Sequence, residues 1–205
     1  LNANVFWTQV NAYQTNAYDA ANRVQYLTNA GSVRSRGIEF ESTVVPLRGL
    51  TLNFNGSYND VSYLSYKDAP CPPEVSQAPG APASCDLSGH QVVGASKWIG
   101  NANGKYEWNL DNGLQPYVTG SYAFRSKAVG TVEDSDYGQI PSYAVVNFST
   151  GLRGDFNQGQ WDVSLWLKNA FDKTYYTTLW TGGNGGYEGL LGTPRTLGVT
   201  GRYDF

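Results

Sequence analysis

The stretch GTPRTLGVTGRYDF (192–205) ends the chain and alternates between two kinds of residue. Apolar, aromatic or glycine residues occupy every second position from Leu197 to Phe205, and polar residues or glycine lie between them. A period of two predicts a β-strand with one apolar and one polar face. Because soluble domains usually end in a frayed polar tail, an aromatic residue at the end of such a strand indicates a different environment.

The same alternation recurs along the chain, and no segment has a convincing helical period. We expect eight strands, within residues 1–14, 36–44, 50–59, 97–110, 114–125, 143–153, 160–168 and 196–205. The connections alternate between short ones (46–49, 111–113 and 155–160) and long ones (about 17–32, 67–95, 126–142 and 176–193). This regular alternation predicts an all-β fold, an antiparallel transmembrane β-barrel with short periplasmic turns and long extracellular loops.

The composition of the chain limits the classes of partner and of membrane structure that we expect. The net charge is −3 and no Lys/Arg-rich run occurs, so we expect no nucleic-acid partner. No stretch is long and apolar enough to predict a transmembrane helix, which leaves the closed barrel as the structure that satisfies its backbone in lipid. A soluble β-sandwich stays open as an alternative, since the polar strand faces would also suit its outer surface.

Aromatic residues gather near the predicted short turns, on the apolar faces of their strands. Rings at that depth form the girdle that anchors a barrel at the membrane surface. The predicted girdle consists of Tyr106, Trp108, Trp161, Tyr203 and Phe205.

Cys71 and Cys85 flank a Pro/Ala/Ser/Gly-rich stretch in the second long connection. No further Cys and no His lies between them to complete a metal site, so we expect a disulfide and an oxidising compartment. The alternative is a pair of free thiols.

Three segments resemble the closing part of TonB-dependent outer-membrane receptors: NAGSVRSRGIEFEST (29–43), LKNAFDKTYY (167–176) and GTPRTLGVTGRYDF (192–205). The resemblance implies that residues 1–205 are the C-terminal part of a plugged barrel of about 22 strands. The plug and the earlier strands would then lie outside this chain, and the absence of Met agrees with a longer or processed protein. The resemblance also implies that Tyr203 and Phe205 belong to the signal read by the barrel-assembly machinery. The alternative is that the eight strands close into a small barrel with a structural or adhesive role.

No catalytic constellation is visible, and we expect neither an enzyme nor a cofactor or metal. His90 is the only histidine and no nucleophile motif accompanies it. The acidic run of Glu133, Asp134 and Asp136 would suit a divalent cation near lipopolysaccharide, but we expect a solvated loop tip there.

The resemblance implies TonB-coupled uptake of a large polar ligand such as a ferric siderophore, in the outer membrane of a Gram-negative bacterium. Expected partners are outer-membrane lipid, lipopolysaccharide, the barrel-assembly machinery and TonB, the last through the plug. Aromatic and Arg side chains at loop bases bind large polar ligands with little loss of entropy. The candidate ligand-binding residues are Arg125, Tyr137, Tyr143, Trp180, Tyr187 and Arg195. Cobalamin, oligosaccharides and peptides are further candidate ligands.

Overall fold

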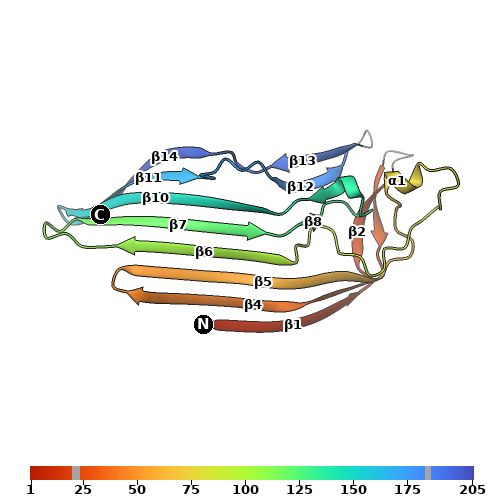
Figure 1. Ribbon diagram of the computed structural model, residues 1–205, viewed down its shortest axis with the longest axis horizontal. Helices are drawn as coiled ribbons and strands as arrows, with labels where there is room; N and C mark the ends of the chain where they lie inside the picture. The colour runs from red at the N-terminus through yellow and green to blue at the C-terminus, as the bar shows by residue number, and fades with distance from the viewer. Residues whose placement is uncertain (20–23, 183–185) are drawn as a thin grey trace.

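The computed structural model describes residues 1–19, 24–182 and 186–205, and its main element is one antiparallel eight-stranded sheet (Figure 1). The middles of the predicted loops 17–32 and 176–193 lie outside the described residues. The spatial order of the strands follows the chain. These strands are β1 (Asn2–Asn11), β4 (Ser32–Leu47), β5 (Leu50–Ser65), β6 (Trp98–Glu107), β7 (Gln115–Arg125), β10 (Tyr143–Phe156), β11 (Gly159–Lys168) and β14 (Thr196–Asp204). All eight predicted strands are confirmed.

The predicted two-faced character of the strands is confirmed by the register. Val5, Ile38, Tyr58 and Trp98 lie in one row across four strands, on the apolar face. Val199 on this face is 69% exposed, although it lies in the middle of a strand. An apolar band of this size is stable only against another apolar phase, and the lipid of a membrane provides one.

The opposite face is polar and its side chains bond across strands. Asn101 donates to Asn55 at 3.0 Å, and Asn147 donates to Ser121 at 2.9 Å. The hydroxyls of Thr119 and Ser149 lie 2.7 Å apart. This face satisfies its own hydrogen bonds in the way expected of a wet lumen surface.

The short turns all lie at one end of the sheet and the long loops at the other (Figure 1). Arg48 and Gly49 join β4 to β5, and residues 157–158 join β10 to β11. The strand predicted over 97–110 ends at Glu107, earlier than expected. Pro116 on the neighbouring strand has no N–H for the ladder, so residues 108–114 form the connection to β7.

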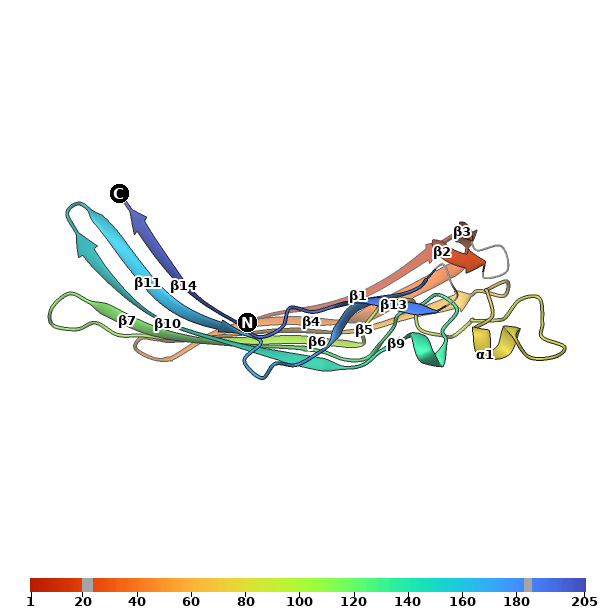
Figure 2. The same ribbon diagram turned by 90° about the horizontal axis from the view of Figure 1, so that it is seen from above.

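Figure 2 shows a curved sheet whose two edge strands, β1 and β14, rise towards the same side. The long loops contain small elements that the alternation of the sequence did not predict. These are the hairpin of β2 (Gln14–Asp19) and β3 (Val24–Asn29), the pair β8 (Ala128–Val129) and β9 (Gln139–Ile140), the hairpin of β12 (Tyr176–Thr181) and β13 (Tyr187–Leu191), α1 (Pro73–Ser76) and the 3-10 helix η1 (Asp136–Gly138). Within the described residues, no helix is long and apolar enough to span a membrane.

Aromatic pairs mark both ends of the apolar band. Tyr106 and Trp108 stack at 5.3 Å near the short turns, as predicted, and Tyr58 packs on Trp98 at 4.7 Å towards the loops. At about 3.3 Å per residue, Trp98 and Tyr106 lie about 26 Å apart along β6. With a strand tilt of about 40°, this corresponds to about 20 Å across the membrane, close to the apolar band of known barrels.

Two glycines of the segment NAGSVRSRGIEFEST (29–43) have clear backbone roles. Gly31 adopts a φ of +67°, and its N–H donates to the side chain of Asn29 at 2.8 Å, which turns the chain from β3 into β4. Six residues later, a Cβ on Gly37 would collide with the backbone oxygen of Tyr58 on the neighbouring strand. The NAG and RG parts of this segment therefore set the turn and the close approach of β4 to β5.

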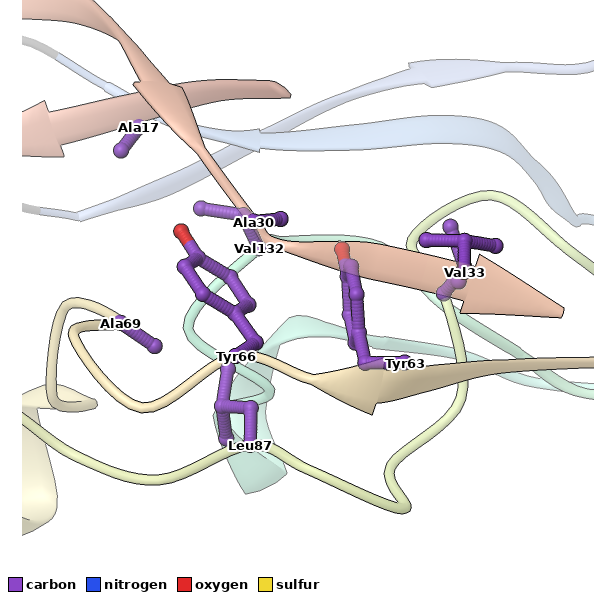
Figure 3. Close-up of a cluster of buried hydrophobic side chains, with 9 residues drawn as sticks. Ala17, Ala30, Val33, Tyr63, Tyr66, Ala69, Leu87 and Val132 are labelled. Carbon is purple, nitrogen blue, oxygen red and sulfur yellow. The ribbon is translucent and has the colours of Figure 1, made fainter. Parts of the chain in front are cut away.

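The largest buried cluster lies among the loops and not within the sheet (Figure 3). Tyr63 and Tyr66 are its largest members, 1% and 2% exposed, with ring centroids 5.0 Å apart. The cluster also contains Ala17, Ala30, Val33, Ala69, Leu87, Val92 and Val132. Val33 and Tyr63 occupy the polar face of the sheet, so the loops fold over that face at its loop end.

Cys71 and Cys85 form a disulfide, as predicted, with their Cα atoms 5.0 Å apart. The backbones of Ala69 and Cys85 exchange two hydrogen bonds beside it. The bond closes the outer part of the 66–97 loop on itself, while residues 87–92 return to the buried cluster.

Candidate functional site

The loop between β5 and β6 is joined to the loop between β7 and β10 by polar contacts. The Glu74 carboxylate accepts hydrogen bonds from the Ser135 hydroxyl at 3.0 Å and from the Asp136 backbone N–H at 2.8 Å. His90 Nδ1 lies 2.7 Å from the Asp134 carboxylate. These contacts turn two long loops into one packed body above the sheet.

The acidic run of Glu133, Asp134 and Asp136 is only partly the solvated loop tip that the sequence predicts. Asp136 is exposed, but Glu133 is only 6% exposed and Ser135 is fully buried. Glu133 Oε1 accepts a hydrogen bond from the Thr181 hydroxyl at 2.8 Å, which attaches this loop to β12. Packing between distant loops buries these polar groups, and strand alternation carries no information about it.

A cavity of about 320 Å³ lies between β2, residues 130–133 and β12. Its polar and aromatic wall consists of Thr15, Asn16, Thr131, Glu133, Trp180 and Thr181, and its apolar wall includes Ala17, Val93 and Val132. Ala17 and Val132 also belong to the buried cluster of Figure 3, so the cavity rests directly on that cluster.

Two of the six candidate ligand residues lie on the β12–β13 hairpin. Trp180 lines the cavity. Tyr187 pairs with Thr181 in the hairpin, and its hydroxyl is buried near Ser135 and Glu133. Burial raises the pKa of Tyr187 to about 12, and the nearby carboxylates of Glu133 and Glu74 act in the same direction. The phenol is therefore neutral under physiological conditions.

Arg125 and Tyr143 face each other in the register of β7 and β10, so the structure brings these two candidates together. The Arg125 guanidinium donates to the Ser96 hydroxyl at 2.6 Å and to the Gly94 backbone oxygen at 2.7 Å. Tyr143 stacks on Tyr175 at 4.3 Å. Both side chains thus have partners within the chain that hold the loops.

The remaining two candidates lie apart from these pairs. Tyr137 on η1 is 74% exposed. The Arg195 backbone N–H donates to Asp172 at 3.0 Å, and the two side chains form a long ion pair of 3.9 Å. The six predicted residues therefore do not form one cluster.

The two C-terminal segments that resemble the receptor family are tied together by Asn169, which is 2% exposed. Its Nδ2 donates to the backbone oxygens of Lys173 and Thr193, at 2.9 and 3.0 Å. Its Oδ1 accepts the Lys173 N–H at 2.9 Å. The Asn of the NAFDK segment therefore fixes both this turn and the approach to the final strand.

A family described as TonB dependent receptor-like, beta-barrel, matches residues 1–170. The chain belongs to this family. Its members lie in the outer membrane of Gram-negative bacteria, which is the location of this TonB-dependent receptor barrel. The family is one of receptors and transporters. No curated protein sequence matches the chain.

Solved receptors share the fold. The chain aligns with BauA, the ferric preacinetobactin receptor of Acinetobacter baumannii, with 17% identity and a TM-score of 0.69, over 99% of this chain and 27% of BauA. With FyuA, the ferric yersiniabactin uptake receptor of Yersinia pestis, it aligns with 18% identity and a TM-score of 0.69, over 99% of this chain and 27% of FyuA. With the siderophore receptor PiuA of A. baumannii it aligns with 16% identity and a TM-score of 0.67, over 98% of this chain and 25% of PiuA. The chain thus spans about a quarter of the length of these receptors.

The residues at the loop end of this receptor barrel that sequence reasoning missed are Glu74, Thr131, Ser135 and Thr181. Each is a polar residue in a loop or in a short hairpin, where neither alternation nor a motif marks it. The nearest signal was the acidic run itself, whose first member Glu133 follows the apolar Val132. Among the described residues, no group of three His, Cys, Asp or Glu side chains could hold a metal ion.

Proposed function

We propose that this chain is the closing wall of a TonB-dependent receptor that imports a large polar ligand such as a ferric siderophore. The observation that carries the proposal is the placement of the loops. They fold over the polar face of the sheet at one end and hold a cavity there. In a closed barrel that face is the lumen, so the cavity lies at its extracellular mouth.

The proposed mechanism assigns this chain a passive but specific part. The ligand first contacts the extracellular loops and a plug that would lie in the lumen. Energy relayed by TonB then moves the plug, and the ligand passes along the polar face. The side chains of that face keep the passage wet, and the loops select what enters. No step of this mechanism requires enzymatic chemistry by these residues.

The sheet itself supports a larger barrel. Its order ends at β1 and β14, and these two strands do not pair with each other in the described chain. An open edge in lipid leaves backbone groups without hydrogen bonds, which is prohibitive. We propose that further strands pair with β1 and β14, in a plugged barrel of about 22 strands. A small barrel closed by β1 and β14 is the alternative, and the observed curvature does not bring these edges together.

The final strand is proposed to carry the signal for the barrel-assembly machinery. Tyr203 and Phe205 lie on the apolar face near the short turns, with ring centroids 6.4 Å apart. Lipopolysaccharide is the proposed outer partner of the apolar face where it meets the loops.

Uptake by cells tests the proposal. The gene is deleted in its host under iron limitation, and import of radioactive iron on a panel of siderophores is compared in the deletion strain, the complemented strain and a strain without TonB. Import of at least one chelate that needs both the receptor and TonB supports the proposal. Import of labelled cobalamin, oligosaccharides and peptides is compared in the same strains, and if no import of any of these ligands depends on both the receptor and TonB, the transport proposal is wrong.

The intact mass and N-terminal sequence of the native protein separate the two architectures. Several hundred further residues that begin with a plug support the large barrel. A native chain limited to these 205 residues supports the small one.

A further inference from the structure

The cavity between β2, residues 130–133 and β12 contains a buried carboxylate. Glu133 lines it and is only 6% exposed. The Thr181 hydroxyl donates to it at 2.8 Å, and Thr181 lines the same cavity, while the buried Tyr187 hydroxyl lies near the same carboxylate. A carboxylate can accept about four hydrogen bonds, so Glu133 still has acceptor positions for a bound ligand.

No ion pair among the described residues involves this carboxylate. The ion pairs of the described residues involve other acids, such as Asp60 with Arg36 and Asp162 with Arg153. The pair next to Glu133 in the sequence is His90 with Asp134, and Glu133 has no cationic partner within residues 1–19, 24–182 and 186–205. Burial of an unpaired carboxylate is unfavourable, and a cation in the cavity would recover that cost.

The other walls suit an organic cation. Trp180 contributes an indole, the ring that attracts cations most strongly. Thr131 is 4% exposed and its hydroxyl has no hydrogen-bond partner in the described chain, so a polar acceptor or donor is also unused there. Ala17 and Val132 form the apolar side, backed by the tyrosine cluster of Figure 3.

A metal ion fits this site poorly. Protein sites for Zn²⁺ or Ca²⁺ gather several ligand side chains, and no group of three His, Cys, Asp or Glu residues that could hold a metal exists in the described chain. The lining instead offers one carboxylate, one indole, one side-chain amide and three threonine hydroxyls, groups that together can recognise a protonated amine. A volume of about 320 Å³ holds such a group with part of the body that carries it.

We propose that this cavity binds a protonated amine of the imported ligand, with the Glu133 carboxylate and the Trp180 indole as its recognition groups. This rests on the proposed function and names the ligand class: a polar ligand that carries an ammonium group, as opposed to a purely anionic chelate. Of the candidates predicted from sequence, Arg125 would instead favour an anion, but its guanidinium is already occupied by Ser96 and Gly94.

Three small probes with the same phenyl body test the charge preference. They are 2-phenylethylamine, which is protonated at neutral pH, 2-phenylethanol, which is neutral, and 3-phenylpropanoate, which is anionic. Each is titrated into the purified full-length receptor labelled with 5-fluorotryptophan. The fluorine resonance of Trp180, assigned with Trp180→Phe, reports binding in the cavity. We expect the amine to half-saturate the shift at about one tenth of the alcohol concentration, and the anion to produce no shift.

The matched variants are Glu133→Gln and Glu188→Gln. Glu188 lies opposite Trp180 in the hairpin, is exposed and does not line the cavity, so it controls for the loss of one negative charge. We expect Glu133→Gln to bring the amine and the alcohol within about twofold of each other, and Glu188→Gln to retain the preference. Heat-modifiable mobility in SDS gels verifies that each variant is folded, and Thr181→Val provides a second variant at the carboxylate.

Equal binding of the amine and the alcohol, tighter binding of the anion, an equal effect of the two Gln variants, or no shift with any probe overturns the proposal. If the titrations contradict the amine site, TonB-dependent import can still be measured in cells. The two proposals can therefore fail independently. Conversely, amine binding without TonB-dependent import would support the proposed amine site in the cavity and contradict the proposed transport function.

Discussion

Asn147 on β10 accepts a hydrogen bond from the backbone N–H of Asn169, at 2.9 Å, and its own Nδ2 donates to Ser121 on β7. Asn169 in turn holds Lys173 and Thr193 through its side chain. A chain of hydrogen bonds therefore runs from the polar face of the sheet to the start of the final strand. Such a network is costly to break once it is buried, because each lost partner leaves an unpaired group.

Asn169→Ala removes three of these side-chain hydrogen bonds. We expect the free energy of unfolding to fall by about 2–4 kcal/mol, because the backbone groups of Lys173 and Thr193 lose the partner that the buried Asn169 side chain provides. Urea unfolding of the full-length receptor in detergent, followed by heat-modifiable mobility, measures the change. Asn109→Ala in the exposed 108–114 connection is the control, and an equal loss there would refute the role of Asn169.

Replacement of both cysteines by serine is expected to loosen one loop and leave the sheet intact. The disulfide spans a sequence separation of 14, for which the chain-entropy model gives about 3 kcal/mol. The stabilisation acts on the outer part of the 66–97 loop, because residues 87–92 are held independently by the buried cluster. Hydrogen exchange should rise within 69–85 and stay unchanged in β5 and β6. Faster exchange throughout both strands would contradict this division.

The contact of Glu74 with η1 is expected to weaken in acid. Partial burial acts to raise the pKa of Glu74, but hydrogen bonds from its own backbone, from the Asp136 N–H and from the Ser135 hydroxyl outweigh it and hold the pKa below its ordinary value of 4.5. A carboxyl with a lowered pKa in the folded state contributes stability above its ordinary pKa and loses it as the pH falls through the lowered value.

Electron paramagnetic resonance can follow this contact through spin labels on encoded keto amino acids at positions 76 and 137. We expect the distance distribution to broaden as the pH falls below about 4.5. Glu74→Gln should show the broad distribution at neutral pH, while Asp86→Asn in the same loop should not. A distribution that stays narrow in acid would show that the loops do not depend on this carboxylate.

The strands were predictable because lipid and lumen impose opposite polarity on neighbouring residues. Val199 and Thr200, or Leu165 and Ser164, reveal their faces from sequence alone. The loop-end site was not predictable in this way. The contact of Glu133 with Thr181 joins residues 48 positions apart, and it depends on how three loops pack. Trp180 lines the cavity, and its role in ligand binding stays a prediction. Arg125 and Arg195 look the same in sequence whether they bind a ligand or a neighbouring group.

A charge on the apolar face is expected to prevent stable insertion. Leu165 pairs with Val199 in the middle of the band, so Leu165→Arg places a guanidinium near the middle of the membrane. Such a change costs about 2–4 kcal/mol in barrels. The folded fraction in lipid vesicles, from gel mobility before and after heating, measures it. Asn103→Arg on the polar face is the matched control, and we expect its folded fraction to remain near that of the unmodified protein.

Phe205 is expected to matter for assembly in cells more than for the stability of the finished barrel. Its side chain is fully exposed and its ring lies near Tyr203 at the short-turn end, so few contacts within the chain are lost in Phe205→Ala. We expect a several-fold lower amount of folded receptor in isolated outer membranes, while refolding of the purified variant into vesicles stays unchanged. Asp204→Ala, on the opposite face of the same strand, should behave like the unmodified protein in both measurements. If the two variants assemble equally well in cells, the terminal aromatic residue is not a signal for the assembly machinery, and its place at the membrane surface is its whole role.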